Sequence, residues 1–386
     1  MLYIGIMSGT SMDGVDVVLC NIEKDSCVFL HNLTYPMPLD LKSDMLQSIR
    51  GSTTLKATGE LHHKLGLLFA NAANALLAHT DTNPLDIIAI GSHGQTLWHE
   101  PESQFPFSLQ LGDPNIISSK TGIPVVADFR QKDISLGGQG APFAPAFHAF
   151  LFNKHNKSSA VVNIGGMANI TILKDKLIGY DTGCGNVLMD IWIKEHKGSS
   201  YDLDGEWARQ GKVKPHLLEA MLGDEYFSKV YPKSTGREKF NQEWLENILS
   251  CYAQLEAHDT LLRGNIQCDK EKRESTILEQ VKYDKTLQAD IQRTLLELTA
   301  LSVANEVKKF NIETCILCGG GAQNTFLVER IRQHLPSTPV VIADNADMLE
   351  AMAFAWLAYM RIHKESVNLK DVTGASKNAI LGGLYL

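Results

Sequence analysis

The 386-residue sequence predicts an α/β protein of two domains. Short apolar, β-prone segments alternate with segments of helical periodicity along the chain, which is typical of α/β folds. Glycine-rich turns follow several of the expected strands, and in such folds these turns face a cleft. At roughly 150 residues per domain, the length itself favours two domains.

The N-terminal part predicts strands followed by a helix. Residues 2–6 and 15–22 are apolar and β-prone, and residues 8–14 between them have the composition of a turn. An amphipathic helix is indicated by apolar residues at three- and four-residue steps, namely Leu61, Leu65, Leu68, Ala72 and Leu76. Further short strands are expected at 87–90, 107–111 and 124–129.

The glycine- and proline-rich segment 137–146 predicts a loop at a border between domains. After it, a strand at 160–164, a glycine turn at 165–169 and a strand at 170–173 repeat the arrangement of residues 2–22, which indicates duplicated domains. The expected domains are an N-terminal one, 1–133, completed by 357–386, and a C-terminal one, 134–356.

The C-terminal half continues the alternation of strands and helices. A strand at 177–180 leads into a turn at 181–186, and residues 259–285, rich in charge and without clean periodicity, predict an exposed excursion. The remaining elements expected are helices at 187–196, 291–310, 325–334 and 347–361 and strands at 314–318 and 340–343.

Composition excludes several classes of protein. The hydrophobic fraction of 44% is near the globular average and rules out disorder as the main state. A net charge of −8 without a sustained basic run argues against nucleic acid as the principal partner. The sequence has no signal-peptide pattern and no apolar run of membrane-spanning length, so a cytoplasmic protein is expected. The CxxC pair Cys315 and Cys318 ends an apolar run, which favours a buried strand over a zinc or redox site.

Three glycine-rich turns, at 8–14, 181–186 and 319–324, are candidate phosphate-binding loops. Glycine lets backbone N–H groups converge on an anion, and Asp13 and Asp181 add carboxylates that could hold Mg²⁺ or accept a proton. A purely structural turn is the alternative for each. The P-loop pattern and the GxGxxG pattern after a strand are both absent, so ATP binding would need another loop architecture.

Four isolated residues are candidates with structural alternatives. His93 could contact a substrate or be satisfied by backbone groups, and Asp128 and Arg130 could bind a ligand or form a simple ion pair. Glu350, at the start of an expected helix, could instead complement the helix dipole.

The segment 5–16 (GIMSGTSMDGVD) resembles the N-terminal signature of anhydro-N-acetylmuramic acid kinases. Further matching segments follow in order, at 91–96 (GSHGQT), 127–130 (ADFR), 137–142 (GGQGAP), 163–169 (NIGGMAN), 181–186 (DTGCGN), 232–238 (PKSTGRE), 319–324 (GGGAQN) and 350–356 (EAMAFAW). The resemblance covers essentially the whole chain. It departs from the family at Cys184, where proline is usual, and in the longer excursion at 259–285.

The resemblance implies the fold and the reaction. That family belongs to the actin, hexokinase and sugar-kinase superfamily, so two duplicated actin/hexokinase-type (ribonuclease H-like) domains with an ATP cleft between them are expected. The implied substrate is 1,6-anhydro-N-acetylmuramic acid, whose O6 is tied to C1 and has no proton to give. Water must attack C1 to free O6 for the phosphoryl group, and the resemblance gives Asp181 the role of deprotonating that water. A homodimer and a role in peptidoglycan recycling are implied as well.

The resemblance also implies the binding residues. Asp13 would hold Mg²⁺, and Arg130 would engage the lactyl carboxylate of the sugar bidentately. The residues implied for ATP are Gly9, Thr10, Ser11, Met12, Asp13, Gly14, Val15, Asp16, Gly165, Gly166, Gly183, Gly319, Gly320, Gly321 and Asn324. The residues implied for the sugar are His93, Thr96, Arg130 and Glu350.

Two other functions stay open at this point. An ordinary hydroxyl-directed sugar kinase of the same superfamily would keep the loops and give different products. A non-catalytic, ATP-dependent switch of the actin type would bind ATP without sugar-stimulated turnover.

Overall fold

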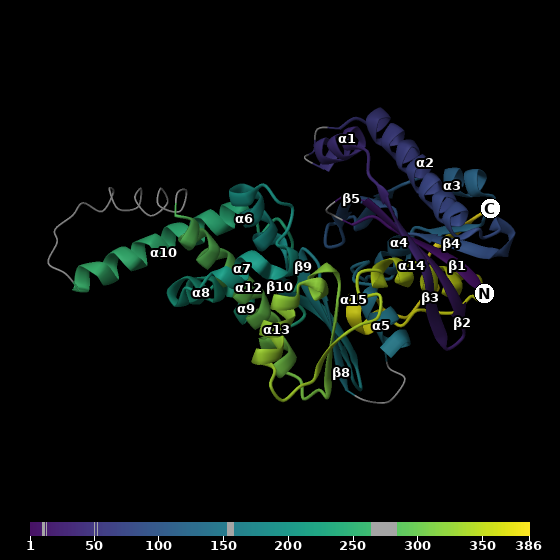
Figure 1. Cartoon of the computed structure of the whole chain (residues 1–386). Helices are drawn as coiled ribbons and strands as arrows, with labels where there is room; N and C mark the ends of the chain where they lie inside the picture. The colour runs from purple at the N-terminus through teal and green to yellow at the C-terminus, as the bar shows by residue number, and fades with distance from the viewer. Residues whose placement is uncertain (10–11, 13, 50, 52, 153–157, 264–283) are drawn as a thin grey trace. The chain divides into compact units, whose positions relative to one another are not determined.

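The computed structural model of the chain describes all residues except 10–11, 13, 50, 52, 153–157 and 264–283, and describes 253–263 only as part of a helix. Thr10, Ser11 and Asp13, and most of the expected excursion at 259–285, therefore lie outside the described residues. Figure 1 shows the elements along the chain. No helix among those described is long and apolar enough to cross a membrane.

The chain divides into two compact units. Unit 1 contains Met1–Asn156, Asp175–Ile178 and Asp347–Leu386, and unit 2 contains Lys157–Lys174 and Gly179–Ala346. This division differs from the expected boundaries after 133 and 356. The reason is that α14 (Leu349–Ile362) packs on the sheet of unit 1, while α5 (Ala144–Phe152) packs on α14 and on a strand of the same sheet.

Unit 1 is built on a six-stranded mixed sheet with the order β13-β7-β4-β1-β2-β3. Its strands are β1 (Leu2–Met7), β2 (Gly14–Glu23), β3 (Ser26–Pro36), β4 (Ile87–Ser92), β7 (Val125–Ala127) and β13 (Gly383–Tyr385). β1 pairs antiparallel with β2 and parallel with β4, and β4 pairs parallel with β7. A separate two-stranded sheet joins β5 (Gln95–Glu100) to β6 (Phe107–Leu111).

The helices of unit 1 bury the faces that the sequence pattern predicts. The apolar stripe from Leu61 to Leu76 is buried along α2 (Leu55–Thr80), and Thr54 caps this helix by accepting a hydrogen bond from the Ala57 N–H. The other helices are α1 (Leu39–Ile49), η1 (Pro84–Asp86), α3 (Pro114–Thr121), α4 (Phe129–Ile134) and α15 (Lys370–Thr373).

Unit 2 is built on a five-stranded sheet with the order β10-β9-β8-β11-β12. Its strands are β8 (Ser159–Ile164), β9 (Met167–Leu173), β10 (Leu177–Cys184), β11 (Thr314–Cys318) and β12 (Val340–Ile342). Cys315 and Cys318 are free thiols buried in β11, and burial raises the pKa of Cys315 to about 12. The prediction of a buried strand at this CxxC pair is confirmed.

One helix of unit 2 is buried along almost its whole length although it carries many polar side chains. This helix, α12 (Lys285–Lys308), buries Asp290, Glu297, Thr299 and Glu306, and each of these side chains binds a group of another segment. The other helices are α6 (Val187–Lys197), η3 (Leu203–Gly205), α7 (Glu206–Gln210), α8 (Pro215–Leu222), α9 (Glu225–Ser228), α10 (Gln242–Arg263), η4 (Gly320–Gln323) and α13 (Thr325–His334).

The two sheets share one topology. In each, the first strand is central, pairs antiparallel with the second strand and parallel with the fourth, and the fourth pairs parallel with the fifth. This is the ribonuclease H-like arrangement. The sequence prediction of duplicated α/β domains is therefore confirmed by the strand order itself.

Two local expectations were wrong. β10 continues to Cys184 beside β9, so Asp181 lies in a strand and not in the expected turn. Its N–H donates to the carbonyl of Lys233, which lies 52 residues further along the chain. The strand expected at 124–129 is limited to Val125–Ala127, and Phe129 begins α4.

Candidate functional site

Asp181 lies in the C-terminal half of β10, and the segment 232–238 orients its carboxylate. Its Oδ2 accepts hydrogen bonds from Ser234 Oγ at 2.8 Å and from the Thr235 N–H at 3.0 Å. Within the described part of the chain, Oδ1 accepts no hydrogen bond. One oxygen of the carboxylate is therefore fixed, and the other is left to meet a ligand or a proton.

Burial raises the pKa of the Asp181 carboxyl above its ordinary value, and the nearby Glu238 adds to the rise. The hydrogen bonds from Thr235 and Ser234 and the charge of Lys233 act in the opposite direction. A carboxylate with a raised pKa is a better proton acceptor at neutral pH than an ordinary surface aspartate. This environment is suited to a general base.

The glycine turn between β8 and β9 lies against the start of α6. Gly185 N–H donates to the Gly166 carbonyl at 2.9 Å, and Asn186 N–H donates to the Gly165 carbonyl at 2.8 Å. A Cβ on Gly185 would lie 2.2 Å from the Gly165 carbonyl oxygen, so no side chain fits at this close approach. Gly165 and Gly166 themselves have room on their outer side, as a phosphate-binding turn requires.

Arg237 lies inside the matching segment 232–238 but is not among the residues that the resemblance implies for binding. A Cβ built on Gly166 would lie 3.7 Å from Arg237 Nη2 and 3.9 Å from Nε. The guanidinium therefore lies over the glycine turn. A cation beside exposed glycine backbone is an arrangement that favours a phosphate group.

A cavity of about 260 Å³ in unit 2 adjoins the third glycine-rich turn. It is lined by Asn186, Met189, Asp190, Tyr201, Asp202, Leu203, Asp204, Gly320, Gly321, Gln323 and Asn324. Tyr201 and Leu203 are 60% and 61% exposed although both are apolar in character, which is what an open face for a planar ligand offers. Three of the residues implied for ATP, namely Gly320, Gly321 and Asn324, thus line one cavity.

The glycines of this turn have different reasons to be glycine. Gly319 adopts a φ of +78°, and a Cβ there would lie 2.2 Å from Asn163 Oδ1. A Cβ on Gly320 would meet no protein atom within 4 Å, although this residue lines the cavity. The Asn324 side chain caps α13 by accepting from the Leu327 N–H at 3.0 Å. The fold thus requires a glycine at position 319. At position 320 the protein itself would accept a side chain, so a requirement for glycine there would come from a bound ligand.

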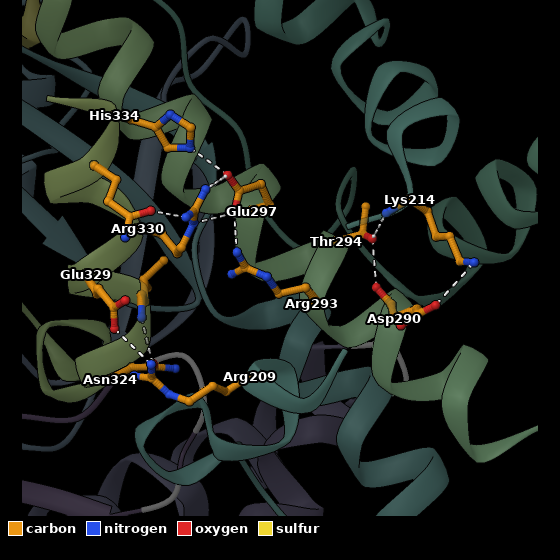
Figure 2. Close-up of polar contacts among 12 residues, drawn as sticks. Arg209, Lys214, Asp290, Arg293, Thr294, Glu297, Asn324, Glu329, Arg330 and His334 are labelled. Atoms are coloured by element: carbon orange, nitrogen blue, oxygen red, sulfur yellow. Dashed lines mark hydrogen bonds and ion pairs between the residues drawn. The ribbon is translucent and has the colours of Figure 1, made fainter. Parts of the chain in front are cut away.

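An ion-pair cluster on α12 holds the helix that follows this turn, as Figure 2 shows. Glu297 accepts two hydrogen bonds from Arg330, at 2.8 and 2.9 Å, and lies 2.6 Å from His334 Nε2. The guanidinium groups of Arg209 and Arg293 also lie over the Phe326 ring at the start of α13. These contacts fix α13, and with it Asn324, relative to α12.

In unit 1 the structure brings His93, Arg130 and Glu350 together. Arg130 Nη2 donates to His93 Nε2 at 2.9 Å, and Nη1 donates to the Gly140 carbonyl at 3.2 Å. Burial and Arg130 lower the pKa of His93 to about 3, so this imidazole is neutral. Burial lowers the pKa of Arg130 to about 10, and the charge of Glu350 opposes that shift. Among the described residues, Arg130 binds His93 and Gly140 and forms no ion pair with Asp128.

The first glycine-rich turn is tied to the segment after β4. Ser8 Oγ donates to Gln95 Oε1 at 2.6 Å, and Gln95 Nε2 reaches the Gly9 carbonyl at 3.5 Å. Met12 N–H donates to the Gly9 carbonyl at 3.1 Å and closes the turn. Thr96, one residue beyond Gln95, uses its hydroxyl oxygen to accept from Gln110 at 3.4 Å.

The end of the expected phosphate segment lies in a strand. Gly14, Val15 and Asp16 begin β2, and the Val15 side chain is fully buried in the core. Only the backbone of Val15 could therefore contact a nucleotide. Asp16 Oδ1 accepts from Thr34 Oγ1 at 2.8 Å, while burial and the nearby Asp347 raise the pKa of this carboxyl.

A cavity of about 510 Å³ in unit 1 adjoins His93. Its wall includes Ser92, Gly94, Gln110 and Asp128, which come from the ends of β4 and β7 and from β6. In open α/β sheets, ligands bind outside the carboxyl ends of the strands, and this cavity lies at such a position.

A protein-family model described as anhydro-N-acetylmuramic acid kinase matches residues 1–386. The anhydro-N-acetylmuramic acid kinase of Sulfurovum sp. (strain NBC37-1) is 57% identical over 385 residues, which cover 100% of this chain and 99% of the relative. The proteins of the same name from Sulfurimonas denitrificans and Aliivibrio fischeri are 49% and 47% identical, over 99% of this chain and over 99% and 98% of their own lengths.

Proposed function

The chain belongs to the anhydro-N-acetylmuramic acid kinase family, and we propose that it opens 1,6-anhydro-N-acetylmuramic acid with water while transferring the γ-phosphoryl group of ATP to O6. The products are N-acetylmuramic acid 6-phosphate and ADP. Family membership over the whole length supports this function above an ordinary sugar kinase or a non-catalytic switch.

The reaction needs a base because O6 of the substrate carries no proton. The water oxygen forms a bond to C1, the C1–O6 bond breaks, and O6 attacks the γ-phosphorus as ADP leaves. One proton of the water must go to the enzyme, and the other stays on the new C1 hydroxyl. In an ordinary sugar kinase the base would instead take its proton from the sugar hydroxyl.

The observation that carries this proposal is the Asp181 carboxylate. Its Oδ2 is held by Ser234 and Thr235, its Oδ1 has no partner among the described residues, and its pKa is raised by burial. We assign to Oδ1 the proton of the attacking water. General-base catalysis of this kind contributes roughly 10²–10⁴-fold to a rate.

We propose that the nucleotide occupies the cavity of unit 2. The exposed faces of Tyr201 and Leu203 would contact the base, and the open side of Gly320 would let the backbone approach it. The glycine turn at 165–166, with Arg237 over it, would contact the phosphates. The turn at 8–16 would contribute the other phosphate contacts, as the family resemblance implies.

We propose that Mg²⁺ accompanies ATP. Asp13 is the residue expected to hold it, and the carboxylate of Asp16, which faces Asp347, is a further oxygen donor of the kind that this hard cation prefers. Among the described residues, which do not include Asp13, no cluster of three or more metal-ligating side chains is present. When bound, Mg²⁺ would neutralise charge on the β- and γ-phosphates.

We propose that His93, Thr96, Arg130 and Glu350 bind the sugar. The guanidinium of Arg130, one nitrogen of which already binds neutral His93, would pair with the lactyl carboxylate. We also propose a homodimer that acts in the cytoplasm in peptidoglycan recycling. Family membership supports the proposals of a dimer, of a cytoplasmic location and of a role in peptidoglycan recycling.

The proposal is tested by turnover in oxygen-18 water. ATP hydrolysis or transfer should depend on the anhydro sugar, and the sugar phosphate should carry one heavy oxygen at C1. Turnover with a free sugar hydroxyl and no label at C1 would support the ordinary kinase, and ATP binding without sugar-stimulated turnover would support the switch.

A further inference from the structure

A buried ion pair is connected by hydrogen bonds to the proposed base. Lys233 Nζ and Glu306 Oε1 are 2.7 Å apart, and their side chains are only 2% and 5% exposed. Glu306 comes from α12, and its Oε2 accepts a hydrogen bond from the Tyr180 hydroxyl at 2.9 Å. Burying two charges costs about as much free energy as their attraction returns, so such a pair is weak evidence for a role in stability alone.

Lys233 is joined to Asp181 by two chains of hydrogen bonds. In the first, the Lys233 carbonyl accepts from the Asp181 N–H at 3.2 Å. In the second, Lys233 Nζ donates to the Tyr226 carbonyl at 3.4 Å, and the Tyr226 hydroxyl donates to the Asp181 carbonyl at 2.8 Å. The Asp181 N–H thus binds the backbone of residue 233, and the Asp181 carbonyl is linked through Tyr226 to the Lys233 side chain.

The same lysine also determines where the partners of the carboxylate lie. Ser234 and Thr235, which bind Oδ2, are the next two residues after Lys233. Glu306 holds the Lys233 side chain in the interior, and this contact limits the movement of the backbone that carries the two donors. A shift of the anchor would move the backbone of Asp181 and the donors to its carboxylate together.

We propose that the Lys233–Glu306 ion pair is a positioning device for Asp181, which holds its carboxylate in the orientation that base catalysis requires. This inference rests on the proposed function of Asp181 as the general base. Neither Lys233 nor Glu306 is proposed to contact the reacting atoms. Both act through the segment 232–235 and through Tyr226.

The charges around Asp181 predict the direction in which its pKa shifts when the Lys233 charge is removed. The groups that face this carboxylate are Lys233 and Glu238 of its own holding segment and Tyr226 of α9, with Glu306 of α12 behind Lys233. Lys233 favours the ionised form of Asp181, and Glu238 disfavours it. Removal of the lysine charge should therefore raise the pH at which the base becomes active.

The first test compares Lys233→Met with Lys233→Arg. We expect Lys233→Met to lower kcat by about 10- to 100-fold, as a displaced catalytic group would, with little change in the KM for ATP. The midpoint of the acid limb of the kcat–pH profile should move to higher pH. Lys233→Arg keeps the charge and should keep the midpoint. A Lys233→Met enzyme with the wild-type kcat and midpoint would overturn the inference.

The double variant Lys233→Met/Glu306→Leu separates positioning from stability. Replacing both charges by apolar side chains should recover much of the melting temperature that either single change lowers, because no unpaired charge stays buried. Recovery is incomplete because Tyr180 and Lys309 also lose Glu306 as their partner. We expect kcat to stay low and the acid limb to stay displaced. Recovery of kcat together with the melting temperature would show that the pair only stabilises the fold.

Glu297→Gln is the matched control on the same helix. The Glu297 side chain is 4% exposed and binds Arg330, but its partners lie on α12 and α13 and not in the segment that holds Asp181 (Figure 2). We expect this variant to lose stability and to keep the acid-limb midpoint. An equal displacement of the midpoint in Glu297→Gln would mean a general effect of α12 and would contradict the inference.

Asp181→Asn, measured in the same assay, separates this inference from the function on which it rests. If Asp181→Asn keeps most of its turnover, the base proposal fails and the positioning inference fails with it. If Asp181→Asn is inactive while Lys233→Met behaves as wild type, only the positioning inference fails.

Discussion

Gly5 on β1 and Gly91 on β4 are paired in register, and both lie under the backbone of α14. A Cβ on Gly5 would lie 1.9 Å from the carbonyl oxygen of Ala351, and a Cβ on Gly91 would lie 2.0 Å from that of Phe354. The helix can approach the sheet this closely only because both residues lack a side chain. This approach fixes three elements of the candidate site, since β1 leads to Ser8, β4 leads to His93, and Glu350 is the second residue of α14.

Gly91→Ala should destabilise unit 1 strongly. The added methyl group would overlap backbone atoms that cannot rotate away, and overpacking of this kind costs about 3 kcal/mol. Gly59→Ala is the control, because Gly59 lies inside α2 with no atom within 4 Å of its Cβ position. There alanine should stabilise by about 0.5–1 kcal/mol through helix propensity. Denaturant unfolding of both variants measures the difference, and equal stabilities would contradict this packing argument.

The sequence predicted the elements whose signal is local. Apolar periodicity marked α2, and the repeated order strand, glycine turn, strand marked both sheets. The reason for Gly5 and Gly91 could not be predicted, because it depends on α14, more than 250 residues further along the chain than Gly91.

The candidate site was predictable only in part for the same reason. The sequence identifies Asp181 because its segment matches a family motif. Its hydrogen-bond donor Ser234, however, lies 53 positions away in the sequence. Glu306, the partner of Lys233, lies a further 73 positions beyond that lysine. Nothing local in the sequence shows which donors a carboxylate will meet. The segment 232–238 matches a family motif, and this match is the sequence signal that points to Lys233, Ser234 and Arg237.

Two buried histidines should make the fold sensitive to acid. Burial lowers the pKa of both His93 and His148 to about 3, against an ordinary value of 6.5. Below pH 6.5 the unfolded chain binds protons that the folded chain refuses, so the free energy of unfolding should fall as the pH falls. Each histidine contributes about 1.4 kcal/mol per pH unit between pH 6.5 and its folded pKa.

His148→Phe isolates one of these contributions, because His148 is not among the proposed ligand-binding residues. The slope of unfolding free energy against pH, measured by denaturant titration between pH 4.5 and 6, should become flatter by about 1.4 kcal/mol per unit. The comparison uses slopes, so a constant loss of packing does not affect it. An unchanged slope would mean that His148 is not held neutral by the fold.

Arg130→Lys should reduce selectivity for the lactyl group of the sugar. Lysine keeps the positive charge but loses the planar fork, one arm of which binds His93 Nε2 and the other the Gly140 carbonyl. We expect the ratio of kcat/KM for the muramic sugar to that for its analogue without the lactyl group to fall about tenfold. An equal loss for both sugars would instead assign Arg130 to positioning His93 and the loop that contains Gly140.

Gly320→Val should raise the KM for ATP by about tenfold or more, which corresponds to roughly 1.4 kcal/mol of lost binding. The valine side chain would meet no protein atom near its Cβ and would extend into the cavity of unit 2. The melting temperature and the KM for the sugar should therefore change little. A lower melting temperature with an unchanged KM for ATP would make Gly320 a purely structural residue.

Asp181→Asn should abolish turnover and keep the binding of ATP and sugar. Asparagine preserves the shape of the side chain and can still accept from Ser234 and Thr235 through its amide oxygen, so the segment 232–238 keeps its anchor. What it loses is the ability to take a proton at the position of Oδ1. Loss of a positioned base costs roughly 10²–10⁴-fold. We expect the upper end of that range, because the same proton transfer must also open the ring.

The structure also defines the alternative role of Asp181, which is purely structural. Asp181 lies in β10 and its carboxylate binds two donors, so its role could be only to fasten the segment 232–238 to the strand. In that case asparagine, which can accept the same two hydrogen bonds, would leave kcat nearly unchanged. The two roles therefore differ by orders of magnitude in a single rate measurement. Titration of ATP and of sugar on the same variant excludes misfolding as the cause of a loss, and a variant that retains most of its kcat would end the proposal of Asp181 as the base.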